Sequence, residues 1–237
     1  MQPCRLAPAT AEPRIIQWLE IEPQQLLRRL GCLRTDRPAV LALNGRSGAG
    51  KSTIAARLVS AVPDAALIST DDIAWNLDMF DWAEVLIAHV IEPALAGAAV
   101  DYRPPGWVRH DRAGSVTVPA DRSLLVVEGV GASQRAMAPA LDAAAWVQSD
   151  FPTARAQGIA RDIASGVNGD EAESIAFWDY WMNAELPFLE ADNPWPRVDG
   201  FLAGVRPEMS DQLLWAPAVD RPAVFSYAAP VPPRPAP

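Results

Sequence analysis

The sequence predicts an α/β fold in which a mostly parallel β-sheet is covered by helices on both faces. Short apolar runs alternate with helical segments from Pro38 onward, a glycine-rich loop joins the first run to a helix, and carboxylates follow two of the runs. Such alternation is typical of βαβ units, whose strands lie parallel in one sheet. The chain of 237 residues is long enough for one sizeable α/β domain or two small ones.

The glycine-rich loop has the sequence Gly-Arg-Ser-Gly-Ala-Gly-Lys-Ser-Thr at residues 45–53, which fits the phosphate-binding P-loop pattern G-x-x-x-x-G-K-[ST]. A strand is expected before it at 39–44 and a helix after it at 54–59, as the motif requires. The glycines let backbone N–H groups turn inward around a polyphosphate, and the helix N-terminus adds its positive end. The predicted phosphate-binding residues are Gly45, Ser47, Gly48, Ala49, Gly50, Lys51, Ser52 and Thr53.

Lys51 is the only lysine of the chain, and the other 19 of its 20 basic residues are arginines. A compact ammonium group therefore stands at the one position where the motif needs it. We expect Lys51 to reach the β- and γ-phosphates of a nucleoside triphosphate, and the Ser52 hydroxyl to be a Mg²⁺ ligand. The alternative is a glycine-rich turn that matches by chance, and the expected strand and helix around it argue against this.

The other elements follow in order along the chain. Residues 1–36 are expected to form an N-terminal extension of one or two amphipathic helices, broken at Pro23. The α/β domain then spans 37–204, with further strands at 65–69, 123–129 and 144–148 and an edge strand at 197–202. Helices are expected at 81–97, 153–165 and from 170 to 186, and residues 205–237 form a Pro/Ala-rich C-terminal tail.

Composition and charge narrow the partners and the compartment. The formal net charge of −9 argues against a protein that coats nucleic acid or anionic membranes by bulk electrostatics. Cys4 and Cys32 form neither a metal-ligand spacing nor a disulfide framework, which fits a reducing cytosol. The N-terminus lacks the apolar core of a signal peptide, and no apolar run approaches the ~18 residues of a membrane span. We therefore expect a cytoplasmic protein with no nucleic-acid or membrane partner.

Carboxylates stand at the ends of two expected strands. Asp71 and Asp72 follow the strand at 65–69, and Glu128 ends the strand at 123–129. In open α/β sheets, ligands bind outside the carboxyl ends of the strands, so these side chains are expected to point towards a nucleotide crevice. The alternatives are a helix cap or solvated turn for the two aspartates and a structural hydrogen bond for Glu128.

The long connection at 98–122 is the other segment that indicates a function. It gathers Trp107, Arg109, His110 and Arg112, and long loops that combine aromatic, basic and imidazole groups in this way are often functional. A surface or packing role is the alternative for His110.

A P-loop alone does not identify the reaction, but motifs missing from the sequence argue against several classes of P-loop protein. A GTPase should carry an N-K-x-D motif, which cannot occur because Lys51 is the sole lysine, and a transporter ATPase should carry an L-S-G-G-Q-like signature, which is missing. Motor and helicase ATPases usually place Asp-Glu after the strand that ends here in a single Glu128. The remaining class is the small P-loop kinases that phosphorylate a metabolite.

The order G-R-S-G-A-G-K-S-T, then S-T-D-D, then V-V-E-G resembles the uridine kinase family, which belongs to a larger group with phosphoribulokinase and bacterial pantothenate kinase. The resemblance covers roughly residues 38–204 and implies a P-loop NTPase fold. It also implies that Asp71 accepts the proton of the substrate hydroxyl, with Asp72 as the adjacent alternative. Glu128 would hold Mg²⁺ together with Ser52.

The resemblance further implies a substrate pocket outside the P-loop. Trp107, His110 and Arg112 resemble the loop that grips the nucleoside base in this family. Asp78 falls where the family binds ribose hydroxyls, although its neighbour Asp81 is open as an alternative and better fits a plain helix cap. With Asp72, these four residues are the predicted substrate-binding set.

The family also closes over ATP with an arginine-rich lid, which the resemblance places at about residues 155–172. Arg161 matches its R-D element and would stabilise transition-state charge together with Lys51, and Arg155 would help to bind ATP. Residues 165–168, Ser-Gly-Val-Asn, stand where the family usually has arginine-glycine.

We therefore expect an ATP- and Mg²⁺-dependent phosphotransferase that moves the γ-phosphate of ATP to a hydroxyl of a uridine- or cytidine-like nucleoside or a similar sugar-like metabolite. The alternative is a catalytically weak or inactive P-loop protein that binds nucleotide and has a regulatory role. The lack of arginine at residues 165–168 of the expected lid favours this alternative. The sequence does not identify the acceptor. It also leaves the oligomeric state open, with a homo-oligomer as one alternative.

Overall fold

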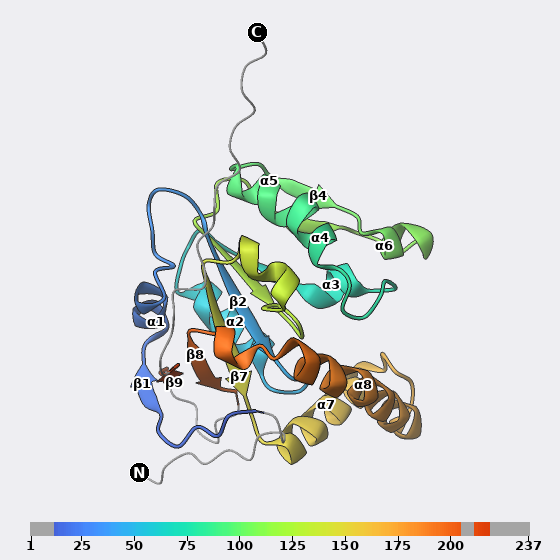
Figure 1. Cartoon of the computed structure of the whole chain (residues 1–237). Helices are drawn as coiled ribbons and strands as arrows, with labels where there is room; N and C mark the ends of the chain where they lie inside the picture. Colours follow the sequence, from blue (N-terminus) through green and yellow to red (C-terminus); the bar gives the residue numbers. More distant parts are fainter. Residues whose placement is uncertain (1–11, 205–210, 219–237) are drawn as a thin grey trace.

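The computed structural model describes residues 12–204 and 211–218, and a seven-stranded sheet forms its centre (Figure 1). The strand order is β1-β9-β8-β7-β2-β6-β3. The bounds are β1 Leu19–Ile21, β2 Ala39–Gly45, β3 Ala65–Ser69, β6 Leu124–Glu128, β7 Ala143–Gln148, β8 Gly200–Ala203 and β9 Leu213–Pro217. From β8 to β3 neighbouring strands pair in parallel, and β9 and β1 add an antiparallel edge. The predicted α/β fold with a mostly parallel sheet is confirmed.

Helices cover both faces of the sheet because alternate apolar residues of its central strands point to opposite sides. In β2, Val40 and Ala42 belong to one buried cluster, whereas Leu41 and Leu43 belong to the other. The cluster around Leu41 packs against α1 (Pro23–Arg29) and α2 (Lys51–Ser60). The cluster around Val40 packs against a continuous helical segment made of α4 (Ala83–Leu86), a π-helical turn (Ile87–Ile91) and α5 (Glu92–Leu95).

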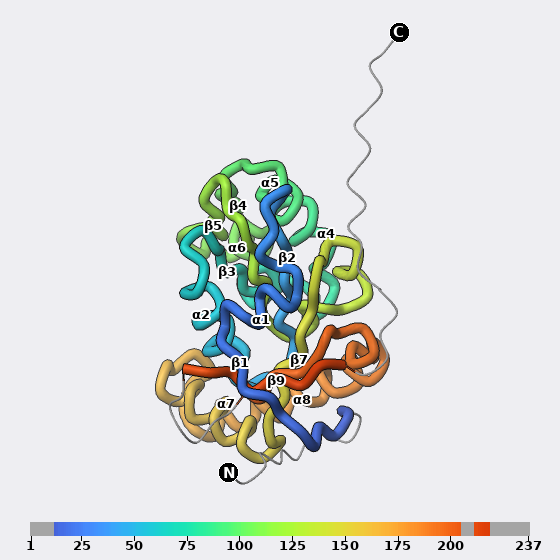
Figure 2. The backbone as a smooth tube through the Cα atoms, turned by 90° about the vertical axis from the view of Figure 1, so that its left-hand side faces the viewer, coloured from blue at the N-terminus to red at the C-terminus, as the bar shows by residue number. Residues whose placement is uncertain are grey.

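The remaining elements lie outside the seven-stranded sheet. They are α3 (Thr70–Ala74), the antiparallel pair β4 (Val100–Tyr102) and β5 (Val116–Val118), α6 (Pro105–Arg109), α7 (Phe151–Ser165), α8 (Glu171–Asp192) and two 3₁₀ helices (Arg135–Ala140 and Trp195–Arg197). In Figure 1, α7 and α8 lie below and α3 and α6 lie above, on the same side of the sheet. Figure 2 shows the same separation, with β4, β5 and α5 at one end of the molecule and α7 at the other.

The strand register brings three chain segments together at the carboxyl ends of the parallel strands. Glu128, the last residue of β6, lies opposite Leu43 of β2 and Ser69 of β3. The strand β2 continues into the P-loop, and β3 leads directly into α3, which begins with Thr70 and Asp71. The carboxyl ends of parallel strands therefore place the P-loop, Glu128 and Asp71 side by side.

At each end of the chain the structure contains a strand that the sequence did not predict. Among the described residues of the N-terminal extension, from 12 onward, one helix is present: α1, which Pro23 begins at a position that tolerates a missing N–H. Residues 19–21 form β1 instead of part of a second helix. The tail expected from residue 205 contains β9, which pairs with β8 and β1, so β8 is internal and is no edge strand. Cys4 and the tail residues 219–237 lie outside the described residues.

The boundary between α7 and α8 agrees with the expected helices. Asp170 caps α8 by accepting the Glu173 N–H at 3.0 Å, and the Glu173 carboxylate accepts the Asp170 N–H at 2.9 Å. This reciprocal pair is a capping box, which satisfies two backbone donors at the helix start. No helix of the described residues is long and apolar enough to cross a membrane.

Candidate active site

The P-loop is held in a shape that requires glycine. Gly48 and Gly50 have positive φ angles of 71° and 92°, in the left-handed region where glycine carries no steric penalty. A Cβ on Gly48 would lie 2.1 Å from the carbonyl oxygen of Ala154, and one on Gly50 would lie 2.5 Å from that of Gly204. Substitution at either position would push the loop away from α7 or from the end of β8.

The loop encloses a cavity of about 260 Å³ at the N-terminus of α2. Its lining consists of Gly48, Ala49, Gly50, Lys51, Ser52, Thr53, Gln157, Gly158 and Arg161. The Lys51 ammonium group is buried in the loop, where it donates a hydrogen bond to the Arg46 carbonyl oxygen at 3.0 Å. Backbone N–H groups, a helix N-terminus and two cationic side chains make this cavity suitable for a polyphosphate. The sequence reasoning missed Gln157 and Gly158.

Ser52 and Glu128 lie together beside this cavity. The Ser52 hydroxyl donates a hydrogen bond to Glu128 Oε1 at 3.2 Å. Two oxygens that bind one octahedral Mg²⁺ at adjacent positions stand about 3 Å apart, and hydroxyl and carboxylate oxygens are ligands that Mg²⁺ accepts. Because no group of three or more His, Cys, Asp or Glu side chains among the described residues could hold a metal, phosphate oxygens and water would complete the coordination. The pair therefore fits a nucleotide-bound Mg²⁺.

Burial raises the pKa of Glu128 above its ordinary value, while Lys51 opposes the shift and Asp71 adds to it by repulsion. A carboxylic acid with a raised pKa in the folded state binds its proton more tightly there than in the unfolded chain. At low pH the bound proton therefore adds to the free energy of unfolding. This contribution is lost as the pH rises from about 4 through the raised pKa of the folded state.

We expect Glu128→Gln to make the nucleotide-free protein more stable than the wild type at neutral pH, since glutamine can still accept the Ser52 hydrogen bond without carrying charge. Thermal unfolding at pH 5 and about pH 8 checks this, and the difference in Tm should grow with pH. Mg²⁺ and ATP should then stabilise the wild type more than the variant. A variant that is less stable than the wild type at about pH 8 without ligand would contradict the prediction.

A second, larger cavity of about 850 Å³ opens beside the P-loop. It is lined by P-loop residues, by α3 and the segment after it, by the end of β6 and by α7 and α8. The residues are Ser47, Gly48, Lys51, Ser52, Asp71, Ala74, Trp75, Asn76, Leu77, Met79, Glu128, Val130, Arg161, Asp162, Ser165, Val167, Asn168, Phe177, Trp178 and Trp181. The two cavities share Gly48, Lys51, Ser52 and Arg161.

The two adjacent aspartates face different surroundings. Asp71 lines the larger cavity, and its charge acts on Glu128. Asp72 does not line it; its side chain accepts a hydrogen bond from Arg112 Nη2 at 2.8 Å, and its carbonyl oxygen accepts the Trp107 indole N–H at 2.7 Å. This arrangement favours Asp71 over Asp72 as the proton acceptor.

The other predicted substrate-binding residues also lie outside the lining of the larger cavity. The Arg112 guanidinium lies over the Trp107 ring, 3.7 Å from its centroid, and His110 meets Trp75 edge to face with centroids 5.7 Å apart. Asp78 accepts the backbone N–H of Phe80 at 3.2 Å. Trp75, the ring that His110 contacts, does form part of the cavity wall.

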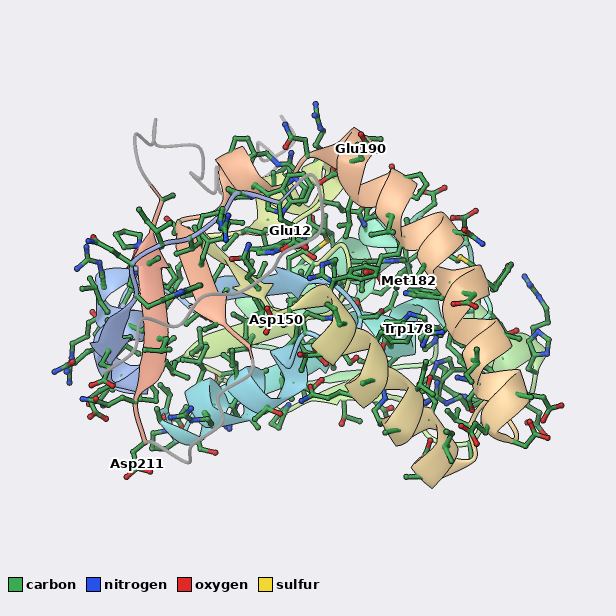
Figure 3. The ribbon with its side chains drawn as sticks, turned by 90° about the horizontal axis from the view of Figure 1, so that it is seen from below. Glu12, Asp150, Trp178, Met182, Glu190 and Asp211 are labelled. Atoms are coloured by element: carbon green, nitrogen blue, oxygen red, sulfur yellow. The ribbon has the colours of Figure 1, made fainter. Side chains whose placement is uncertain are left out.

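The segment at 155–172 that the resemblance assigns to a lid belongs to the helix pair α7–α8. Arg161 faces both cavities and is oriented by Asp162, whose Oδ1 accepts hydrogen bonds from Arg161 Nε at 3.0 Å and Nη2 at 2.8 Å. Arg155 instead points to α8, with an ion pair to Asp179 at 3.5 Å, and lines neither cavity. Figure 3 shows Trp178 and Met182 of α8 on the side facing α7, where Trp178 packs against Gly158.

Two buried carboxylates also contact the P-loop, and the sequence reasoning did not single them out. Glu12 of the N-terminal segment forms an ion pair with Arg46, and Glu185 of α8 accepts hydrogen bonds from Ser47. Both glutamates lie far from their partners along the chain, so no local motif signals them. Trp181, one helical turn before Glu185 in α8, donates its indole N–H to this carboxylate.

The sequence matches no protein-family model and no curated protein. Among solved structures, the chain is similar to a possible uridine kinase from Bacillus stearothermophilus, with 19% identity, a TM-score of 0.48 and coverage of 76% of this chain and 96% of that one. It is also similar to a protein from Silicibacter sp. TM1040 described as a fructose transport system kinase, with 17% identity, a TM-score of 0.47 and coverage of 65% and 84%. The order of the sheet and the P-loop between β2 and α2 make the chain an α/β protein of the P-loop NTPase fold, and its motifs are uridine kinase-like.

Proposed function

We propose that the protein is an ATP-dependent small-molecule kinase that transfers the γ-phosphate of ATP to a hydroxyl group of a nucleoside or a similar sugar-like metabolite. The observation that carries this proposal is that the phosphate cavity and the larger cavity meet at Lys51, Ser52 and Arg161. Asp71 lies in the wall of the larger cavity. A γ-phosphate bound over Lys51 would therefore face an acceptor hydroxyl at Asp71.

The chemistry required of the side chains is modest, because phosphoryl transfer depends mainly on positioning and on neutralising charge. Lys51 and Arg161 would neutralise the phosphate oxygens during transfer, and Asp71 would orient the acceptor hydroxyl and take its proton late in the reaction. A Mg²⁺ ion held by Ser52 and Glu128 would neutralise charge on the β- and γ-phosphates when bound.

The larger cavity favours an acceptor without phosphate or carboxylate groups. Of the described residues in its lining, the cationic ones are Lys51 and Arg161, and both also face the phosphate cavity. Its other charged residues are the carboxylates Asp71, Glu128 and Asp162, which would repel an anionic acceptor. The rings of Trp75, Phe177, Trp178 and Trp181 offer apolar faces against which a base or a sugar ring can pack.

The alternative of a regulatory nucleotide-binding protein is favoured by one observation. The groups that the family resemblance assigns to base recognition are paired with each other, since Arg112 is bound to Asp72 and stacked on Trp107. If recognition has been lost, ATP would bind without being consumed.

Measurement of ADP release with ATP, Mg²⁺ and a panel of nucleosides, sugars, aminoglycosides and sugar phosphates separates the two functions. We expect at least one acceptor without phosphate groups to stimulate release and the sugar phosphates to have no effect. Lys51→Ala is the control, which should remove stimulated release because the γ-phosphate loses its ammonium partner. Folded protein that binds ATP and shows no stimulation by any acceptor would contradict the kinase proposal.

A further inference from the structure

Glu185 is a fully buried carboxylate of α8 that contacts the P-loop. Its oxygens accept the Ser47 backbone N–H at 3.1 and 3.3 Å, the Ser47 hydroxyl at 2.7 Å and the indole N–H of Trp181 at 2.5 Å. The carboxylate therefore joins two segments that are 138 residues apart in the sequence.

These partners are all uncharged, and no ion pair of the described residues includes Glu185. A buried carboxylate without a cationic partner is unfavourable unless hydrogen bonds replace its lost hydration. Three donors aimed at its two oxygens supply that replacement. The cluster is thus a specific arrangement that depends on Ser47, Trp181 and Glu185 together.

The position of the cluster relates it to the proposed reaction. Ser47 and Trp181 both line the larger cavity, whereas Glu185 does not. The carboxylate lies behind the cavity wall and holds one wall residue from the phosphate loop and one from the lid helix. Movement of α8 relative to the P-loop would have to break these hydrogen bonds.

We propose that Glu185 is a positioning residue, which fixes the aromatic wall of the acceptor cavity relative to the phosphate loop. This role rests on the proposed kinase function. Transfer requires the acceptor oxygen and the phosphorus to be held about 3–3.5 Å apart, and a misplacement of about 1 Å can lower the rate 10²-fold. Glu185 sets this distance indirectly, through Trp181 on the acceptor side and Ser47 on the phosphate side.

The variant Glu185→Gln is the first test, because it keeps the size of the side chain. Glutamine presents one acceptor oxygen and an NH₂ group, so the three donors can no longer all be satisfied. We expect kcat to fall by about 10- to 100-fold and the acceptor KM to rise, while the Kd for ATP changes less than about threefold. Glu190→Gln is the matched control, since Glu190 is an exposed glutamate of the same helix (Figure 3) and should behave as the wild type.

A second variant separates positioning from general loss of structure. Trp181→Phe keeps an aromatic ring in the wall but removes the N–H that Glu185 accepts. If Glu185 acts through Trp181, the double variant should be less impaired than the product of the two single effects predicts. Circular dichroism and thermal unfolding confirm that each variant is folded before its kinetics are compared.

Each outcome bears on the proposal. Equal kinetics for Glu185→Gln and Glu190→Gln, in a wild type that turns over, would contradict the role of Glu185 and leave the kinase function intact. Tighter ATP binding by Glu185→Gln would also contradict it, because the carboxylate would then compete with phosphate for the Ser47 N–H. A wild type without acceptor-stimulated ADP release would overturn the kinase function and the positioning role together.

Discussion

Asp71→Asn is expected to lower kcat by about 10²- to 10⁴-fold while ATP binds as tightly as in the wild type. Asparagine has almost the same shape as aspartate but cannot take a proton from the acceptor hydroxyl. Because Asp71 lies in the wall of the larger cavity and outside the lining of the phosphate cavity, its replacement should affect transfer and leave the polyphosphate contacts in place. Steady-state ADP release and calorimetric titration with ATP measure the two effects separately.

Asp72→Asn is the matched control for this prediction. It makes the same chemical change one residue further along α3, where the side chain pairs with Arg112 and is 41% exposed. An ion pair with this exposure contributes little to stability. Because Asp72 also does not line the larger cavity, we expect kcat to change less than about threefold. A large loss of activity in Asp72→Asn with a wild-type rate in Asp71→Asn would reverse the assignment of the proton acceptor.

Glu12→Ala is expected to destabilise the protein by about 3–5 kcal/mol, because it removes one partner of a buried ion pair. Arg46 and Glu12 are 2% and 6% exposed, and Arg46 Nε donates to Glu12 Oε1. Glu12 Oε2 also accepts the Trp146 indole N–H at 3.1 Å and the Gln148 amide N–H at 3.2 Å. Alanine at position 12 would therefore leave a buried guanidinium and two further donors without their carboxylate.

The free energy of unfolding, measured with urea for the wild type and for Glu12→Ala, checks this prediction. Glu22→Ala is the control, because Glu22 lies in the same N-terminal segment but is exposed and makes no side-chain cap to α1. The double variant Glu12→Ala/Arg46→Ala should lose less stability than the sum of the single variants, since the unpaired buried charge is then absent. Equal stability of Glu12→Ala and Glu22→Ala would show that the ion pair contributes little.

The Glu12 contact also gives the N-terminal extension a role that helical packing alone would not. Arg46 is the second residue of the P-loop, and its carbonyl oxygen accepts the hydrogen bond of the Lys51 ammonium group. Its guanidinium donates in turn to the Ser149 carbonyl oxygen at 2.8 Å. Loss of Glu12 should therefore loosen the loop that holds Lys51 as well as the carboxyl end of β7 beside it.

The parts of this protein that the sequence predicted are those encoded by neighbouring residues. The P-loop pattern, the apolar strand before it and the carboxylates that follow β3 and end β6 lie within short segments. Parallel strands place their carboxyl ends at one edge of a sheet. The positions of Glu128 beside Ser52 and of Asp71 near Glu128 follow from that rule.

The predictions that failed concern segments whose local pattern competes with distant partners. The spacing of Ile15, Ile16 and Leu19 fits a helix, but Leu19 pairs with Trp215 in the sheet. The segment around Trp215 precedes a Pro/Ala-rich stretch, and its sequence pattern did not predict a strand. In the structure it forms β9, which pairs with β8. β1 forms because it pairs with β9, about 200 residues away, and β9 forms because it pairs with both β1 and β8. Local propensity does not report such partners.

By itself, the sequence determined that this chain folds as a P-loop α/β protein with its carboxylates at the strand ends, because one glycine loop and a few short apolar runs specify those features locally. Only the tertiary structure decided that Asp71 and not Asp72 faces the cavity, since the orientation of α3 separates two adjacent, chemically identical side chains. It also decided that Glu12 and Glu185 support the P-loop from opposite ends of the sequence. Buried carboxylates need donors, and which donors meet them depends on how distant segments pack.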